Sequence, residues 1–314
     1  MIDSIGIQSI EYSLPKSVTT LAKLKSNNKL KSDVALLSSF GFEKVHIGES
    51  HMLLAEKALV SLLKNTRLDP LSIDLFVYAG ALPDSNLAVQ STKKGLTFFK
   101  YAASKLQYDF GLSNAIVLSV SQQGCVSLMN AMWLAMNTLK TENTLKTAVC
   151  LSADVLPSYA SREIIYNAMS DASCAVLLEK AATQNTIIAY NQISKGYYWD
   201  PDAKRNEIVA AYFPTAKLLI EKTLQKANVP ISQIDWIIPH NVSKKSWEIL
   251  LGLLKFPFAK LYGKNIKNIG HTIAADNFIN LKDALDEKAI KRGQLVLLFT
   301  FGFGAHWSCM IIRR

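Results

Sequence analysis

The stretch AIVLSVSQQGCVSLMNAMW, residues 115–133, decides what kind of fold this chain forms. A short apolar run stops at Gln-Gln-Gly, a single cysteine follows, and apolar residues then return with helical spacing. The pattern predicts a strand, a tight turn that Gly124 permits, and a buried helix. If Cys125 is only a small core residue, the chain can be any α/β protein. If Cys125 is a nucleophile on a strand-to-helix turn, the function follows from it.

The length and composition of the chain indicate a large globular protein. Its 314 residues suit two domains or one duplicated domain better than a single core, and 49% of them are hydrophobic. No apolar run reaches the ~18 residues that a membrane span needs, and the N-terminus lacks the basic-then-apolar layout of a signal peptide. We therefore expect a cytoplasmic protein with no membrane partner.

The four cysteines are widely spaced and form no CxxC pair, which argues against a metal site and against a disulfide scaffold. Three of them lie in apolar runs where burial is expected, namely Cys150, Cys174 and Cys309. Cys125 is the exception. We expect reduced thiols and no bound metal ion.

The charge of the chain favours an anionic partner, although solubility alone is the more common reason for such a balance. There are 35 Lys and Arg against 25 Asp and Glu, a formal net charge of +10. Six lysines and one acid lie from Lys244 to Lys267, with aromatic residues among them. Nucleic acid could use such a patch, but no nucleic-acid-binding motif accompanies it, so we expect no nucleic-acid partner.

Two segments of the chain share one organisation. AEKALVSLLKNTRLDPLSIDLFVY (55–78) and AKLLIEKTLQKANVPISQIDWIIP (216–239) each indicate an amphipathic helix, a Pro/Ser turn, an Ile-Asp pair and a buried strand. One such match can arise by chance, but its offset of 161 residues, from Ala55 to Ala216, is about half the chain and favours a duplication. Strands and helices also alternate elsewhere, as in α/β layers: strands at 147–152, 174–178, 295–300 and 308–312, helices at 127–140 and 278–290.

Three later stretches place glycines and histidines after buried segments: Pro239-His240-Asn241, Gly270-His271-Thr272 and Phe301-Gly302-Phe303-Gly304. Together with Gly124-Cys125, they resemble in order the signatures of the thiolase superfamily, specifically its β-ketoacyl-[acyl-carrier-protein] synthase III branch. That family carries an active-site Cys, a Pro-His-Gln-Ala-Asn motif, a Gly-Asn-Thr motif and a C-terminal glycine turn. The resemblance extends from residue 41 to residue 314.

The resemblance implies an α/β fold of the thiolase type, with two duplicated βαβαβαββ-type halves in five alternating layers of helix and sheet. We place the halves at residues 1–180, which carry Cys125, and 181–314, which carry His240 and His271. It also implies a homodimer, with a heteromeric partner as the alternative.

By the same resemblance, Cys125 takes an acyl group from a thioester, and the backbone N–H groups of Cys125 and Gly302 form an oxyanion hole. His240 donates a hydrogen bond to the thioester carbonyl of a second substrate, or acts as a base. No cofactor is bound permanently. The substrate is an acyl group carried on the phosphopantetheine of an acyl carrier protein or on CoA.

His271 stands where the family has asparagine, and this departure leaves two chemistries open. A Cys-His-His set resembles the elongating synthases, which decarboxylate a malonyl thioester. Asp276 follows five residues later, and a Gly-His…Asp arrangement resembles family members that pass an acyl group to oxygen or nitrogen. An aspartate that orients a histidine makes it a better base, which a hydroxyl or amine acceptor needs. Alternatively, His271 caps the next helix and Asp276 is a solvated acid in its first turn.

The donor side departs from the family as well. The Trp and Arg with which the family holds the CoA adenine are absent from residues 35–41, which leaves Arg162 as a candidate for meeting a phosphate. The loss favours an acyl carrier protein as the donor. Because carrier proteins are acidic, Lys244 and Lys245 are expected to dock the carrier and its phosphopantetheine arm.

We therefore predict an acyltransferase with a ping-pong mechanism through Cys125. Decarboxylative Claisen condensation with a malonyl-type thioester, in a specialised biosynthetic pathway, is favoured slightly because both histidines occupy synthase positions. Ester or amide formation is the alternative, and a non-catalytic partner subunit of a related synthase is the rival hypothesis. Residues 82–86, 98–99 and 211–213 are candidates for the lining of the substrate pocket.

Overall fold

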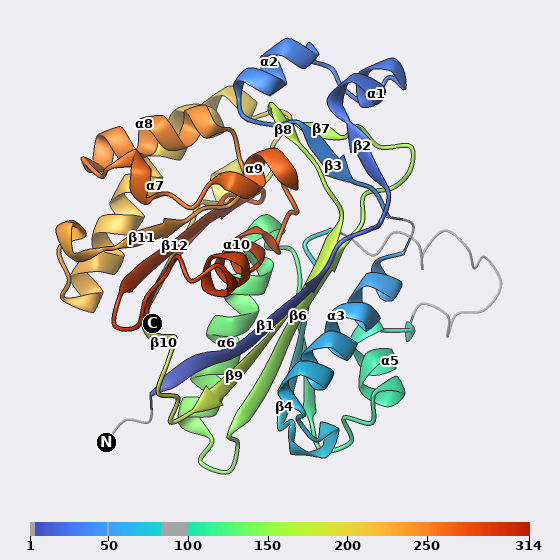
Figure 1. The fold of residues 1–314 in the computed structure, drawn as a ribbon, viewed down its shortest axis with the longest axis vertical. Coiled ribbons are helices and arrows are strands. Elements are labelled where there is room, and N and C mark those ends of the chain that lie inside the picture. The colour runs from blue at the N-terminus through green and yellow to red at the C-terminus, as the bar shows by residue number, and fades with distance from the viewer. Residues whose placement is uncertain (1–3, 49, 83–98) are drawn as a thin grey trace.

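The computed structural model describes residues 4–48, 50–82 and 99–314, and its first half follows the order βαβαβαββ (Figure 1). The elements are β1 (Ile5–Ser13), α3 (His51–Thr66), β4 (Leu75–Ala79), α5 (Ala102–Asp109), β5 (Ile116–Val120), α6 (Ser127–Thr141), β6 (Thr147–Asp154) and β9 (Ala172–Lys180). Two additions interrupt this order. After β1 come β2 (Val18–Thr20), α1 (Leu21–Ser26), α2 (Val34–Ser39) and β3 (Lys44–His46), and after β6 come β7 (Glu163–Ile164) and β8 (Asn167–Ala168).

The second half repeats the order with one strand reduced. Its elements are β10 (Thr186–Ser194), α7 (Arg205–Ala227), β11 (Trp236–Ile238), α8 (Lys244–Leu254), α9 (Lys264–Asn268), α10 (Asp276–Asp286), β12 (Leu295–Gly302) and β13 (His306–Arg313). Where the first half has β5 parallel to β4, the second half has a single bridge from Ile237 of β11 to Leu261. The predicted βαβαβαββ halves are therefore confirmed, with the third strand of the second half shortened to one bridge.

The offset of 161 residues also relates elements of the structure. The 3-10 helices Pro70–Ser72 and Ile231–Gln233 are related by it, and so are the first residues of β4 and β11. Ala55 of α3 and Ala216 of α7 are both fully buried. The small methyl side chain at each position lets the helix lie close to its sheet. The division of the chain at residue 180 stays a prediction, and it falls between the end of β9 and the start of β10.

The strands and helices form the five predicted layers. Nine strands are hydrogen-bonded in the order β11-β12-β13-β10-β1-β9-β6-β4-β5, and the two halves join through the pair Gly6–Thr186 of β1 and β10. Helices α6 and α10 lie between the two half-sheets (Figure 1). Helices α3 and α5 cover the outer face of the first half-sheet, and α7 and α8 cover the outer face of the second.

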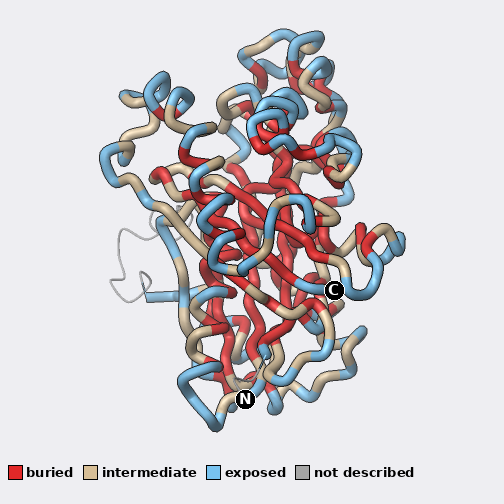
Figure 2. The backbone as a smooth tube through the Cα atoms, turned by 90° about the vertical axis from the view of Figure 1, so that its left-hand side faces the viewer, coloured by how far each residue is buried: buried red, intermediate tan, exposed pale blue. Residues whose placement is uncertain are grey.

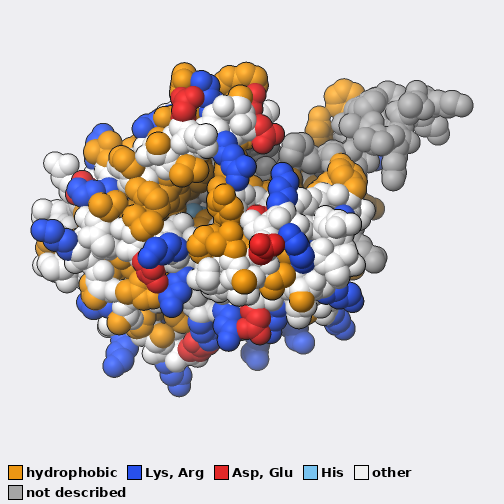
Figure 3. All heavy atoms as spheres, turned by 90° about the horizontal axis from the view of Figure 1, so that it is seen from above, with side chains coloured by type: hydrophobic (Ala, Val, Ile, Leu, Met, Phe, Trp, Pro, Cys, Tyr) orange, Lys and Arg blue, Asp and Glu red, His pale blue; other side chains and the backbone are white. Residues whose placement is uncertain are grey.

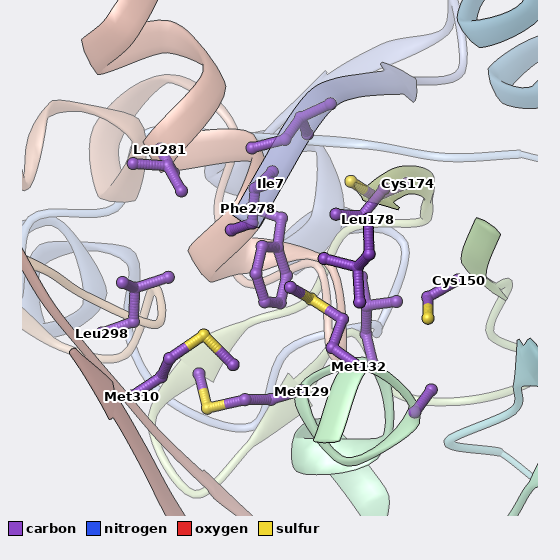
Figure 4. Packing of buried hydrophobic residues seen from close by; sticks show 14 of the residues in the cluster. Ile7, Met129, Met132, Cys150, Cys174, Leu178, Phe278, Leu281, Leu298 and Met310 are labelled. Atoms are coloured by element: carbon purple, nitrogen blue, oxygen red, sulfur yellow. The ribbon is translucent and has the colours of Figure 1, made fainter. Parts of the chain in front are cut away.

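The central layer holds the main hydrophobic core. Figure 4 shows Met129 of α6, Phe278 of α10 and Met310 of β13 converging there, with Cys150 and Cys174 at the side of the first half-sheet. Both cysteines are fully buried, as their apolar runs predicted. Figure 2 shows the same distribution along the backbone, buried through the middle of the molecule and exposed at its rim. Strands covered on both faces have nearly continuous apolar sequences, which is why these runs could be recognised.

The two central helices position the candidate site. Cys125 lies in the 3-10 turn Gly124–Val126 directly before α6, and Asp276 is the first residue of α10. The positive ends of both helix dipoles therefore point at these side chains. Among the helices of the described residues, none combines the length and the hydropathy that crossing a bilayer requires.

Candidate active site

The turn that carries Cys125 is tightly packed against a second glycine turn. Gln122 and Gly124 have positive φ values of 61° and 54°, so the chain reverses sharply between β5 and α6. A Cβ atom on Gly124 would lie 2.7 Å from the Phe303 carbonyl oxygen, and one on Gly302 would lie 2.7 Å from the Cys125 nitrogen. Only glycine at both positions allows the two backbones to approach this closely.

His271 connects Cys125 to Asp276. Its Nε2 atom lies 3.4 Å from the Cys125 Sγ atom, and its Nδ1 atom lies 2.5 Å from Asp276 Oδ2. The imidazole therefore does not cap helix α10, whose N-cap is Ala275. Asp276 is fully buried, so it is not a solvated acid of the first turn. Both alternatives given above, a helix-capping His271 and a solvated Asp276, are therefore wrong.

Asp276 is held by hydrogen bonds on both carboxylate oxygens. Thr272 donates its backbone N–H and its hydroxyl to Oδ1, each at 2.6 Å, and the Asn241 N–H donates to Oδ2 at 2.6 Å. Burial alone would raise the pKa of Asp276, but its attraction to His271 and these hydrogen bonds keep the pKa below its ordinary value. Asp276 is thus a carboxylate that fixes the orientation of the imidazole.

His271 is poised to carry a proton. Burial alone would lower the pKa of His271, but attraction to Asp276 and to Cys125 raises it well above its ordinary value. This environment therefore favours an imidazolium paired with the Asp276 carboxylate. The group can give its proton to a leaving thiolate and later take one from an acceptor.

His240 lies close to His271 but has different partners. Its ring is fully buried, with its centroid 6.3 Å from that of His271. The Nδ1 atom lies 3.2 Å from the Phe299 carbonyl oxygen, which can only accept, so Nδ1 carries the hydrogen. The Nε2 atom then accepts from the Tyr212 hydroxyl at 3.3 Å. Burial and the neighbouring His271 lower the pKa of His240 to about 3, so this ring stays neutral.

A cavity of about 200 Å³ opens over Cys125 and His271. Its other lining residues are Ala81, Leu82, Gln122, Gly124, Ile164, Asn167, Met169, Ile273 and Phe303. A second cavity of about 880 Å³ shares Ala81, Leu82 and Gln122 with it, so the two spaces adjoin. Figure 3 shows one face of the molecule with a hollow near its middle and hydrophobic side chains around it. His240 and Gly302 are not among the described residues that line either cavity.

Phe303 is the site residue that the sequence analysis missed. It lines the cavity over Cys125, whereas Gly302 does not line this cavity and packs against the Cys125 turn. The Phe303 nitrogen would lie 2.8 Å from a Cβ atom on Gly124, which places this N–H beside the Cys125 turn. The spacing of the glycines in the motif predicted the turn, but it did not predict which residue of the turn faces the cavity.

The predicted pocket segments have different outcomes. Residues 83–86 and 98 lie outside the described residues, Leu82 lines the cavity, and Tyr212 contacts His240.

Arg162 does not lie where a phosphate could reach it, which corrects the expectation from the sequence. The residue is 3% exposed, its Nη1 atom forms an ion pair with Asp171 Oδ1 at 2.5 Å, and its Nη2 atom donates to the Leu156 carbonyl. A guanidinium that is already paired and desolvated would lose this pair by turning outward. Arg162 therefore supports the backbone next to the larger cavity.

Lys244 and Lys245 begin α8 and are both exposed. Lys244 lies over the Phe258 ring at 5.4 Å, and Lys245 forms an exposed ion pair with Glu248 at 3.1 Å. Lys244 also lines a surface groove of about 360 Å³ together with Gly41, Phe258, Leu261, Gly263, Lys264, Ile266 and Lys267. The fold therefore gathers three of the six clustered lysines around one partly apolar groove.

In the described part of the chain no group of His, Cys, Asp or Glu is placed to hold a metal ion.

The chain is similar in sequence and in fold to several known proteins. Residues 224–314 match the family model described as 3-oxoacyl-[acyl-carrier-protein] synthase III C terminal. The beta-ketoacyl-[acyl-carrier-protein] synthase III of Wolbachia pipientis wMel is 25% identical over 316 aligned positions, which cover 93% of this chain and 95% of that protein. The structure of 3-oxoacyl-[acyl-carrier-protein] synthase III from Aquifex aeolicus VF5 superposes with a TM-score of 0.83 at 22% identity, covering 99% of this chain and 100% of its own. ChlB3, described as an acyltransferase, superposes with a TM-score of 0.81 at 15% identity, covering 99% and 97%.

Proposed function

Because the chain belongs to the thiolase superfamily, in its β-ketoacyl-[acyl-carrier-protein] synthase III branch, we propose that it transfers acyl groups through a thioester on Cys125. The observation that carries this proposal is the continuous chain of contacts from Cys125 through His271 to Asp276. A nucleophile bonded to a base that a third group orients is the arrangement that covalent catalysis needs. It supports a catalytic protein over a non-catalytic partner subunit.

In the first half-reaction the Cys125 thiolate attacks the carbonyl carbon of the donor thioester. The bond from Cys125 sulfur to carbon forms, the bond to the carrier sulfur breaks, and His271 gives its proton to the departing thiolate. The raised pKa of His271 suits a group that starts protonated. We propose the N–H of Cys125 and that of Gly302 or Phe303 as the donors that stabilise the oxyanion.

In the second half-reaction, neutral His271 takes a proton from the acceptor as the acceptor attacks the acyl carbon. Asp276 stabilises the imidazolium that forms, as a buried carboxylate does in a nucleophile–base–acid triad. The sulfur of Cys125 then leaves as a thiolate next to this imidazolium. A hydroxyl or an amine is the class of acceptor that this base can activate.

The environment of His240 is what favours such an acceptor over a malonyl-type thioester. Decarboxylation needs hydrogen-bond donors for the enolate that forms when CO₂ leaves. His240 was expected to be one such donor, but its only hydrogen is given to the Phe299 carbonyl and its Nε2 atom accepts from Tyr212. Ester or amide formation, within a specialised biosynthetic pathway, is therefore the activity we propose, with decarboxylative condensation as the second candidate because the relatives are named synthases.

Intact-protein mass spectrometry after incubation with acyl-CoA and acyl-carrier-protein thioesters tests the acyl-enzyme. We expect one acyl group on the wild type, one on Cys150→Ala and none on Cys125→Ala. Cys150 is the matched control because it is a fully buried cysteine outside the site. Acylation that survives Cys125→Ala, or no acylation by any donor, would contradict the proposal.

We further propose an acyl carrier protein as the donor, docked at the groove beside α8. The groove combines Lys244, Lys264 and Lys267 with the apolar Phe258, which suits an acidic surface with some apolar contact. Charge reversal by Lys244→Glu with Lys245→Glu should raise the KM for an acyl carrier protein about tenfold and leave the KM for acyl-CoA unchanged. Equal changes in the KM values for the two donors would contradict docking of the carrier at this groove.

A homodimer is proposed as well. Strand β5 lies at the edge of the nine-stranded sheet, and its Ile116 is 51% exposed. An apolar edge strand is a ready template for pairing with another chain. Sedimentation of the purified protein should give twice the 34.8 kDa mass of the chain, and a single-chain mass at micromolar concentration would contradict the proposal.

A further inference from the structure

The turn before Cys125 has a conformation that the rest of the molecule must hold. Gln122 has a φ of 61°, a left-handed conformation that residues other than glycine adopt at a cost. Gly124 has a φ of 54° two residues later. A backbone of this kind persists where surrounding contacts fix it, and the direction of the Cys125 side chain depends on it.

His306, the first residue of β13, provides one such contact from the other half of the molecule. One of its ring nitrogens, Nδ1, lies 2.7 Å from the Ser194 hydroxyl oxygen. The Gln122 backbone also acts on the ring by raising its pKa, and Nε2 is the ring nitrogen that is left to meet the Gln122 carbonyl. A Cβ atom on Gly304 would lie 3.0 Å from His306 Nε2 and 3.7 Å from the Gln122 oxygen, so both atoms lie close to Gly304.

The hydrogen bonds around His306 have one consistent direction. Gln192 of β10 donates its amide to Ser194 at 3.2 Å, the Ser194 hydroxyl donates to His306 Nδ1, and His306 Nε2–H donates to Gln122. This arrangement needs a neutral ring. Burial lowers the pKa of His306, and the Gln122 carbonyl opposes that shift only in part, so the neutral form prevails at pH 7.

The neighbouring Gln123 is held by the same network. Its side-chain oxygen accepts from the Asn130 amide at 2.7 Å and from the Gln192 amide at 3.3 Å. Asn130 is in turn bonded by the buried Tyr190 and by Ser308, at 3.1 Å for the serine. Strands β10 and β13 thus hold two consecutive residues of the nucleophile turn, one by its carbonyl and one by its side chain.

We propose that His306 is a positioning residue that fixes the Gln122 carbonyl and thereby sets the approach of the Cys125 sulfur to His271. His306 does not line the cavity over Cys125, so it acts through the turn and not on the substrate. The role in catalysis rests on the proposed function, whereas the effect on the Cys125 thiol can be measured without any acyl substrate.

The test compares His306→Phe with His306→Gln. Phenylalanine keeps an aromatic ring and removes both hydrogen bonds, whereas glutamine retains an N–H donor for the Gln122 carbonyl. We expect His306→Phe to slow alkylation of Cys125 by iodoacetamide about tenfold, since small displacements of a reacting group have effects of this order. The kcat of acyl transfer should fall by a similar factor with KM unchanged, and His306→Gln should restore most of both rates.

Mass spectrometry of peptides identifies the alkylated cysteine. Cys150, Cys174 and Cys309 should stay unmodified, because they are fully buried. Ser194→Ala is a second variant, expected to cause a smaller loss because it leaves the contact with Gln122 in place. Unchanged alkylation and kcat in His306→Phe would overturn the proposal. So would a loss that follows the folded fraction in thermal melts and is not rescued by His306→Gln. A wild type without acyl-transfer activity would instead contradict the proposed function, and the alkylation rates would still decide the role of His306.

Discussion

His240 and His271 lie with their ring centroids 6.3 Å apart, and both are almost completely buried. Burial alone would lower the pKa of each ring. His271 gains Asp276 and Cys125 as partners, and its pKa rises well above the ordinary value. His240 gains a carbonyl and a hydroxyl, and its pKa falls to about 3. The partners of a buried histidine, and not its depth, therefore decide whether it can move a proton.

The largest effect is expected from removing the two histidines in turn. His271→Ala should slow acyl transfer from Cys125 about 10³-fold, because a general acid–base group contributes between about 10² and 10⁴. His240→Ala should slow it less than about tenfold, since its ring nitrogens are bonded within the protein. Single-turnover decay of the isolated acyl-enzyme measures both rates. Equal losses in the two variants would contradict the different roles of His240 and His271.

Asp276→Asn should have the next largest effect, a loss of about 10²-fold in the same assay. The amide cannot stabilise the imidazolium, so the pKa of His271 should fall toward its ordinary value. Because the neutral imidazole is the base for transfer to the acceptor, the acid limb of the pH–rate profile should move to lower pH in this variant. A limb that stays in place would show that Asp276 does not tune His271.

The pH dependence of stability tests whether His240 is neutral in the folded protein. Its pKa is about 3 in the folded protein and about 6.5 when exposed, so the unfolded chain takes up this proton first. The stability that neutral His240 contributes is full above pH 6.5 and is lost as the pH falls from 6.5 toward 3. Urea unfolding at pH 7, 5.5 and 4 should therefore show wild type losing stability relative to His240→Gln. A constant difference between the two would mean that His240 is protonated in the folded state.

Tyr212→Phe should have the smallest effect. It removes one hydrogen bond to a neutral ring, which is worth about 1 kcal/mol of unfolding free energy. Acyl transfer to a hydroxyl or amine acceptor should change less than about threefold. Tyr197→Phe is the control, because Tyr197 is 60% exposed and should cost little in either measurement. A large loss of transfer in Tyr212→Phe would place His240 in the reaction after all.

The parts of the molecule that local sequence patterns describe were predicted well. The apolar runs of β6, β9, β12 and β13 were found because both faces of these strands are covered. The turn before α6 was predicted from the glycine at residue 124, and the five-layer order was predicted from the family resemblance. Helix α7 begins at Arg205, well before Ala216, where the helix of the repeated segment was expected to start. Pro214 lies inside this helix, although a proline usually marks a helix boundary.

The contacts that separate the two histidines could not be predicted, because they join distant parts of the chain. Tyr212 reaches His240 from α7, 28 residues away, and no spacing rule signals that contact. Arg162 was assigned to a phosphate because the family's adenine-holding residues are absent from residues 35–41, but its partner Asp171 lies on the far side of the β7–β8 addition. The meeting of Cys125 with His271 across 146 residues was within reach only through the family resemblance.

A competition experiment distinguishes acyl transfer to an amine from decarboxylative condensation. The isolated acyl-enzyme is offered a malonyl thioester and a simple alkylamine together, and the products are identified by mass spectrometry. The arrangement of His271, Asp276 and His240 predicts the acyl amide and no release of CO₂. A β-ketoacyl thioester with release of CO₂ would contradict it and would return His240 to the role of a hydrogen-bond donor in condensation.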